Sequence, residues 1–301
     1  MALMLFLLPA CAGGAELSSG GATPSPSPAA SISPSEGPSA APSPSPTQPT
    51  SRAERLAGRL TNVDANLKTG IKEWLKVDDG RPRGKRFDAI EILGLKKQKM
   101  MRTLVKRASL SHKVLPRLGS TLRLEAKRNI KAARGLYKLT PPLKPKDVKL
   151  ETSRADHPMK LIRYYKAAER RFGVQWSVLA AINLVESRMG RINGPSSAGA
   201  LGPMQFMPAT WDAYGKGDPF KPYNAIMAAA RYLAANGAPE RLSNALWNYN
   251  RSDYYVNGVI AYHRHMAAHP KSYFSYYLWQ VFARTTKGDM QLTGPGNTYP
   301  Y

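Results

Sequence analysis

The chain has 301 residues, a net charge of +24 and a single cysteine, Cys11. One cysteine cannot form an internal disulfide, so packing rather than cross-linking must stabilise the fold. This length allows roughly two domains of about 150 residues each. The charge is uneven, because residues 1–51 contain no lysine or arginine, residues 52–150 carry 27 basic and 9 acidic side chains, and residues 151–301 carry 17 and 9.

The first eleven residues, MALMLFLLPAC, form an apolar run that ends at small residues and Cys11. A membrane-spanning helix needs about 20 residues, so this run is too short to cross a bilayer, but it has the length of a secretory signal. Its end, LLPAC, resembles a bacterial lipobox, in which the cysteine is lipidated and becomes the new N-terminus. We therefore predict a lipoprotein signal peptide over residues 1–11, with an ordinary cleaved signal as the alternative. No basic residue precedes the run, which places the expected start of translation a few residues upstream.

Residues 12–51 alternate proline with serine and alanine and contain almost nothing apolar to bury. Such a composition predicts a disordered linker, extended and partly polyproline II. Following Cys11, it is expected to tether a folded body to a membrane. A disordered tail without an anchor is the alternative.

Residues 52–150 combine helical periodicity with most of the positive charge. Their apolar residues recur every three or four positions, which predicts amphipathic helices. The helical stretches are 53–76, 87–108 and 120–139. Because no cluster of histidines, cysteines or paired acids is present, we expect a helical spacer or wall-binding region. Its charge favours a polyanion, which could be nucleic acid, anionic lipid or an acidic wall polymer. The alternative is a helical segment whose solvated face is basic without a specific partner.

One acidic residue stands out in the stretch INLVESRMG, residues 182–190. A helix here places Glu186 on the packed side, close to the C-terminal end of the helix. Burial and the negative end of the helix dipole both disfavour a charged carboxylate, so the pKa of Glu186 should be raised. The group would then keep its proton near neutral pH, as a general acid must. The alternative is a structural glutamate paired with Arg188 or Arg191.

The stretch GPSSAGALGPMQFMPATW, residues 194–211, is rich in glycine, proline and serine, which predicts a tightly turned loop or small hairpin. Its amides, hydroxyls and soft apolar side chains suit a sugar ligand. Two further helices are expected, one capped by Asn224 and one by Ser252. The aromatic tail FSYYLWQVF should pack on the domain.

Three segments, in order, resemble the soluble lytic transglycosylase (SLT) domain of bacteria, and most closely its lipoprotein versions in actinobacteria. They are LVESRMGRINGPSSAGALGPMQFMPATW, NAIMAAARYLAANGAP and ALWNYNRSDYYVNGVIAY. The resemblance extends from about residue 160 to 265, a third of the chain. It implies a mainly helical, lysozyme-like catalytic domain with a small loop or hairpin, which we assign to residues 151–301.

The resemblance also implies the residues of the site. Glu186 matches the single catalytic acid and base of the family. Ser196 matches a serine that contacts the N-acetyl group of the sugar, and Ser197 is the alternative because the spacing from Glu186 is one residue longer than in some relatives. The other matches are Met204 and Gln205, which line the cleft, Tyr249, which helps to position the reacting group, and Asn250, which follows it.

Neither a metal nor another cofactor is expected. Some relatives carry an aspartate-rich loop that could hold calcium, but the corresponding stretch here, GKGDPF, contains only Asp218. His263, His265 and His269 lie on one basic helix without an acidic residue nearby. They are therefore expected at its surface rather than in a zinc site.

The implied reaction is cleavage of the β-1,4 bond between N-acetylmuramic acid and N-acetylglucosamine, with formation of 1,6-anhydromuramoyl ends. A retaining glycosidase ordinarily uses two carboxyl groups about 5–5.5 Å apart, whereas the motifs supply one, so the substrate would provide the nucleophile. The alternatives are a hydrolytic muramidase and a non-catalytic peptidoglycan-binding lipoprotein. Nucleic acid is not an expected partner, because no base-reading motif accompanies the export signal. The expected location is the outer face of the cytoplasmic membrane, with a lipid anchor, facing the cell wall.

Overall fold

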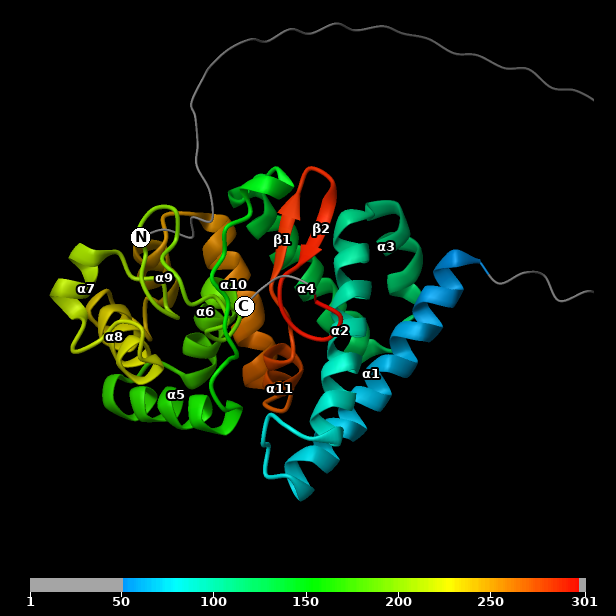
Figure 1. The fold of residues 1–301 in the computed structure, drawn as a ribbon, viewed down its shortest axis with the longest axis horizontal. Helices are drawn as coiled ribbons and strands as arrows, with labels where there is room; N and C mark the ends of the chain where they lie inside the picture. Colours follow the sequence, from blue (N-terminus) through cyan, green and yellow to red (C-terminus); the bar gives the residue numbers. More distant parts are fainter. Residues whose placement is uncertain (1–50, 298–301) are drawn as a thin grey trace, which may run out of the picture. The chain divides into compact units, whose positions relative to one another are not determined.

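The computed structural model describes residues 51–297, and this region is mainly helical, as predicted (Figure 1). Its α-helices are α1 (Arg52–Val77), α2 (Lys85–Lys106), α3 (Ala108–Val114), α4 (Ser120–Leu139), α5 (Pro158–Phe172), α6 (Trp176–Ser187), α7 (Pro208–Tyr214), α8 (Pro222–Ala235), α9 (Leu242–Tyr249), α10 (Asp253–Ala268) and α11 (Ser272–Tyr277). Two 3-10 turns, η1 (Leu115–Arg117) and η2 (Pro145–Asp147), and an antiparallel pair of strands, β1 (Phe282–Thr285) and β2 (Gly288–Gln291), complete its regular structure. None of these helices is both long and apolar enough to span a bilayer. The predicted signal peptide and almost all of the predicted linker lie outside the described residues.

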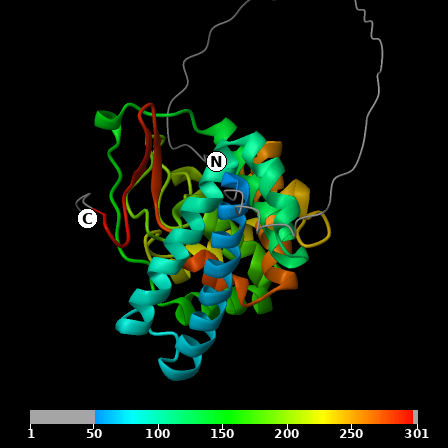
Figure 2. The same ribbon diagram turned by 90° about the vertical axis from the view of Figure 1, so that its right-hand side faces the viewer.

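The basic region begins with two long helices, α1 and α2, that lie side by side, as Figure 2 shows. Helix α1 starts at a capping box: the Ser51 hydroxyl accepts the N–H of Glu54 at 3.2 Å, and the Glu54 carboxylate accepts the N–H of Ser51 at 2.8 Å. Its apolar stripe faces inward, with Leu60, Leu67 and Trp74 buried. The three helices predicted from periodicity in this region are confirmed as α1, α2 and α4.

Helix α6 is the most buried helix of the second half of the chain. Every residue from Ser177 to Ser187 is buried, because the helix is apolar nearly all round and must be covered on every side. Helices α5, α8, α10 and α11 provide that cover. The C-terminal end of α6, where Glu186 lies, is therefore held rigidly.

Residues 52–150 and the following residues contribute to the same hydrophobic core. Trp74 of α1 and Leu136 of α4 belong to one buried cluster with Leu179 of α6. The close approach of α2 to the chain after α11 depends on a glycine: a Cβ on Gly94 would lie 2.7 Å from the Cβ of Leu278. The basic region thus packs directly on the elements that carry the candidate site.

A buried charge cluster joins α1, α2 and α4. The Nζ of Lys97 lies 2.7 Å from Oδ1 of Asp64 and 2.6 Å from Oε1 of Glu125, and all three side chains are almost fully buried. Lys68, at the surface, also pairs with Asp64, at 2.7 Å. These contacts offset the cost of burying the charges, because each one has an opposite partner.

Several local predictions are wrong. Helix α8 begins at Pro222 with Lys221 at its N-cap, so Asn224 lies inside the first turn, where its side chain donates to the carbonyl of Asp218. His265 is buried rather than at the surface, 3.9 Å from Glu125, and burial lowers its pKa to about 4 although Glu125 opposes the shift. The C-terminal hairpin β1–β2 was not predicted, since each strand has only four residues.

Candidate active site

Glu186 lies in the last turn of α6, with only 3% of its surface exposed. The hydroxyl of Tyr255, near the start of α10, donates a hydrogen bond to Oε1 of Glu186 at 2.7 Å. Tyr255 is itself fully buried. Within residues 51–297 neither Arg188 nor Arg191 forms an ion pair with Glu186, so the alternative of a structural ion pair at the helix end is wrong.

The environment of Glu186 favours the protonated carboxyl group. Burial raises the pKa of Glu186 from its ordinary 4.5 to about 8, and the Tyr255 hydrogen bond opposes this shift because it stabilises the carboxylate. The raised pKa predicted from the sequence is thus confirmed. A carboxyl group with this pKa holds its proton at neutral pH and still has a partner that stabilises it after the proton leaves, which suits a group that acts first as an acid and then as a base.

The end of α6 is clamped to the loop that follows it. The Ser187 hydroxyl donates to the carbonyl of Pro203 at 2.6 Å and accepts the N–H of Gly190 at 2.9 Å. The side-chain amide of Asn183 donates to the same Pro203 carbonyl at 2.8 Å. The helix stops there because Arg188 adopts a left-handed conformation, with a φ of 54°. These bonds fix the loop around Pro203 next to Glu186.

The loop itself is tightly turned, as predicted, and it closes with a bridge between Leu201 and Phe206. Gly202 has a φ of 69°, and a Cβ there would lie 2.0 Å from the carbonyl oxygen of Pro219, so only glycine fits. Gln205 is almost fully buried, and its side-chain amide donates to the carbonyl of Gly202 at 2.9 Å. The loop conformation is therefore maintained by its own hydrogen bonds.

Met204, in this loop, and Tyr249, at the end of α9, are fully buried. The Tyr249 hydroxyl donates to the carbonyl of Met204 at 2.6 Å, so it is engaged with the loop and not with Glu186. The ring of Tyr249 stacks parallel to that of Tyr255, with the centroids 6.2 Å apart. Tyr249 therefore supports the tyrosine that contacts Glu186, instead of contacting it directly.

Of the other predicted site residues, Ser196 and Ser197 lie early in the loop and Asn250 lies directly after α9. The Ser196 hydroxyl accepts the N–H groups of Ala200 and Ala198, at 2.9 and 3.2 Å, so it shapes the turn in which it lies. Ser197 is exposed, and Asn250 is buried directly after α9. The structure thus gathers Gln205, Met204 and Tyr249 around one loop, with Ser196 at its start.

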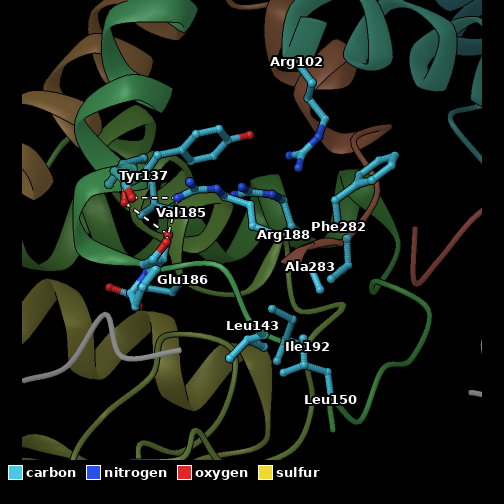
Figure 3. Close-up of a pocket in the computed structure, with 15 residues that line it drawn as sticks. Arg102, Tyr137, Leu143, Leu150, Val185, Glu186, Arg188, Ile192, Phe282 and Ala283 are labelled. Carbon is cyan, nitrogen blue, oxygen red and sulfur yellow. Dashed lines mark hydrogen bonds between the residues drawn. The ribbon is translucent and has the colours of Figure 1, made fainter. Parts of the chain in front are cut away.

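A cavity of about 120 Å³ opens beside Glu186 (Figure 3). Its apolar lining includes Val185 and Phe282, and three arginines also line it: Arg102 from α2, Arg188 after α6 and Arg284 from β1. Two of these arginines come from outside the region that resembles a known family. The basic helices and the C-terminal hairpin therefore build part of the wall next to the acid.

Tyr255, Arg102 and Arg284 were not among the predicted site residues, and Arg188 was named only as a possible ion-pair partner of Glu186. The signal for Tyr255 was present, because it shares one helical face with Val259 and Tyr262, whereas its neighbour Tyr254 is exposed. A tyrosine on a buried face needs a partner for its hydroxyl, and Glu186 is the polar group of the packed side. The arginines carried no such signal, since their meeting depends on how distant elements pack.

Among residues 51–297, no three His, Cys, Asp or Glu side chains gather in a way that could hold a metal ion. Residues 163–272 match the family model described as the transglycosylase SLT domain, and this range includes Glu186, the loop around Gln205, Tyr249 and Tyr255. No curated protein and no solved structure matches the chain. Residues 163–272, which run from within α5 to the first residue of α11, are thus similar to a transglycosylase SLT domain.

Proposed function

We propose that the protein is a peptidoglycan lytic transglycosylase and that Glu186 is its only catalytic carboxyl group. The observation that carries this proposal is the buried Glu186 carboxyl, with a pKa near 8 and a hydrogen bond from Tyr255, inside an SLT domain. An SLT domain implies cleavage of peptidoglycan glycan strands, and with it a location at the cell wall.

Glu186 would act twice in one reaction. It first donates its proton to the oxygen that links N-acetylmuramic acid to N-acetylglucosamine, so the C1–O bond breaks and the N-acetylglucosamine leaves as an alcohol. The muramoyl N-acetyl oxygen assists at C1. The resulting carboxylate, stabilised by the Tyr255 hydroxyl, then removes the proton of the muramoyl C6 hydroxyl as this oxygen bonds to C1. The product is a 1,6-anhydromuramoyl end, and Glu186 is protonated again.

The charges that shift the pKa of Glu186 include no second carboxyl group among the described residues. This favours a substrate-assisted reaction, because the ordinary retaining mechanism needs a nucleophilic carboxylate about 5–5.5 Å from the acid. Ser196, Gln205 and the loop between them would hold the sugar, with Tyr249 and Asn250 behind them.

Product analysis tests the proposal. We expect purified peptidoglycan, digested by the full chain, to release muropeptides whose masses are lower by one water than those of hydrolytic products. Hydrated reducing ends in their place would identify a hydrolytic muramidase. Glycan binding without any cleavage would identify the non-catalytic alternative.

Replacing Tyr255 by phenylalanine should change the pH dependence of cleavage. Because Glu186 must be protonated, wild-type activity should be lost as the pH rises through about 8. The variant loses the hydrogen bond that lowers the pKa of Glu186, so this decline should move to higher pH. The kcat should fall about tenfold to a hundredfold, since a hydrogen bond to a charged group is lost.

Tyr249→Phe is the matched control, because Tyr249 bonds to the Met204 carbonyl and not to Glu186. Its alkaline decline should stay at the wild-type pH. If Tyr255→Phe also left the decline where it is, the proposed coupling between Tyr255 and Glu186 would be wrong.

We further propose that Cys11, outside the described residues, is lipidated and that the linker to residue 51 tethers the enzyme to the outer face of the membrane. The cationic helices of residues 52–150 would then face the acidic polymers of the wall. Metabolic labelling with palmitate, followed by recovery of labelled protein from the membrane fraction, tests the anchor.

A further inference from the structure

The cavity beside Glu186 contains more positive than negative charge. Three arginines line it, Arg102, Arg188 and Arg284, and among residues 51–297 Glu186 is the only acidic residue that does so. With a pKa of about 8, Glu186 is uncharged at neutral pH. Figure 3 shows the side chain of Arg102 directed across the cavity toward Arg188 and Phe282.

The partners of these arginines do not balance their charges. The Nε of Arg102 lies 2.8 Å from Asp289, but Asp289 is shared with Lys106 at 2.6 Å, and the Nη2 of Arg102 is buried without a hydrogen-bond partner. Arg284 donates to the backbone carbonyls of Tyr137 and Thr140. Within residues 51–297, neither Arg188 nor Arg284 forms an ion pair with a carboxylate.

The three arginines are part-buried, and guanidinium groups withdrawn from water are costly unless anions compensate them. Burial lowers the pKa of Arg188, and the neighbouring Arg102 guanidinium adds to this effect. Apart from Tyr137 and Thr140, the rest of the cavity wall is apolar, with Leu143, Val185 and Ile192 among its residues. The cavity therefore suits a small group that carries one negative charge next to a hydrocarbon part.

We propose that this cavity binds a carboxylate carried by the lactyl substituent of the muramoyl residue that is being cleaved. The inference rests on the proposed function, because it takes the sugar above Glu186 to be muramic acid. Paired guanidinium groups match a planar carboxylate, and the apolar wall would cover the lactyl methyl group. The carboxylate is either that of the lactyl group itself, on glycan without peptide, or one on the attached peptide stem.

This role gives residues outside the SLT domain a share in substrate selection. Arg102 lies in the basic helices and Arg284 in the C-terminal hairpin, and both lie beyond residues 163–272. A carboxylate bound there would orient the muramoyl ring relative to Glu186. The chain would then discriminate between glycans by the charge on the lactyl substituent.

The experiment compares the full chain on four substrates: peptide-free glycan, glycan with stem peptides, and the methylamide form of each, in which the carboxyl groups are converted. Wild-type kcat/KM should be about tenfold to a hundredfold higher on the charged form than on its methylamide, as expected for hydrogen bonds to a charged group. In Arg102→Gln and Arg188→Gln this ratio should fall to about one. A preference seen with peptide-free glycan assigns the lactyl carboxylate, and one seen only with stem peptides assigns the peptide carboxylate.

Lys106→Gln is the matched control, because Lys106 pairs with the same Asp289 but does not line the cavity, and its ratio should remain that of the wild type. If a cavity variant fails to fold, the inference is tested by the wild-type ratio of kcat/KM on the charged glycan to that on its methylamide. A wild-type ratio of one on both glycans overturns the inference, as does an unchanged ratio in both folded arginine variants.

Failure of the proposed function is recognised separately by measuring binding in the Glu186→Gln background. Suppose that the wild type cleaves none of the glycans, but that the Glu186→Gln variant binds the charged glycan at least tenfold more tightly than its methylamide. The carboxylate site then stands and the catalytic proposal falls. If cleavage occurs without any charge preference in rate or binding, the catalytic proposal stands and the carboxylate site falls.

Discussion

Glu186→Gln should lower the rate of peptidoglycan cleavage by about 10³- to 10⁴-fold, which is the upper part of the range for loss of a general acid–base group. Glutamine has the same shape and can still accept the hydrogen bond from Tyr255, but it has no proton to donate to the leaving oxygen. The release of soluble muropeptides over time is the measurement.

The same substitution should make the protein more stable at neutral and alkaline pH. The pKa of Glu186 is about 8 in the folded protein and 4.5 when the group is unperturbed, so between these values the folded state holds a proton that the unfolded state releases. The free energy of unfolding of the wild type therefore falls by about 1.4 kcal/mol per pH unit in this window through this group. Glutamine removes that dependence. The difference in free energy of unfolding between the variant and the wild type should therefore grow as the pH rises from 4.5 to 8, and it should not change with pH below 4.5.

Urea unfolding at pH 4, 6 and 8 measures this effect without reference to catalysis. Glu240→Gln is the matched control, because Glu240 is exposed in the same domain and should change neither cleavage nor the pH dependence of stability. Substantial cleavage by Glu186→Gln would sink the catalytic assignment. A stability difference that does not grow with pH would show that Glu186 titrates like an exposed glutamate.

Lys97→Met should destabilise the protein by about 3–5 kcal/mol, the cost typical of removing one partner from a buried ion pair. The substitution leaves Asp64 and Glu125 buried without their common cation. Because these residues lie on α1, α2 and α4, the whole basic region should loosen. Urea or thermal unfolding measures the loss.

The destabilisation by Lys97→Met should depend on pH in a defined direction. In the wild type, the pKa of Asp64 is lowered although burial acts to raise it, because Lys97 and Lys68 outweigh burial. Without Lys97, burial should raise the pKa of the Asp64 carboxyl group above its value in the unfolded chain. The destabilisation by Lys97→Met should therefore be largest at pH values where Asp64 is ionised, and it should shrink as the pH falls and Asp64 takes up a proton.

Lys68→Met is the matched control, since Lys68 pairs with the same Asp64 but its side chain is 58% exposed. We expect a loss below about 1 kcal/mol for this exposed pair. Replacing Asp64, Lys97 and Glu125 together by apolar residues of similar volume should restore most of the stability. An equal effect of Lys68→Met and Lys97→Met would show that burial does not govern this cluster.

The helices follow from local patterns that a sequence displays directly. The apolar stripe of α1 and the helix that carries Glu186 depend on neighbouring residues, so periodicity located these elements. The hairpin β1–β2 escaped because four-residue strands carry too few side chains to show an alternation.

The tyrosine that contacts Glu186 is one of three tyrosines that lie close together in the sequence. Tyr249, Tyr254 and Tyr255 are the same amino acid and occur within seven positions of the chain. Tyr249 is directed to the Met204 carbonyl, Tyr254 is exposed, and Tyr255 reaches Glu186. Tyr254 and Tyr255 point to different faces of α10, and Tyr249 lies on another helix, α9.

By itself, the sequence determined the helical class, the position of Glu186 at a helix end, the raised pKa of its carboxyl group and the tightly turned loop that follows it, because each depends on residues within a few turns of one another. Only the tertiary structure decided that Tyr255 contacts Glu186 and that Arg102, Arg188 and Arg284 share one cavity. Those arginines are separated by up to 182 positions. They meet because the tertiary fold brings α2, the end of α6 and β1 around one cavity, and such a meeting of distant elements leaves no periodic trace in the chain.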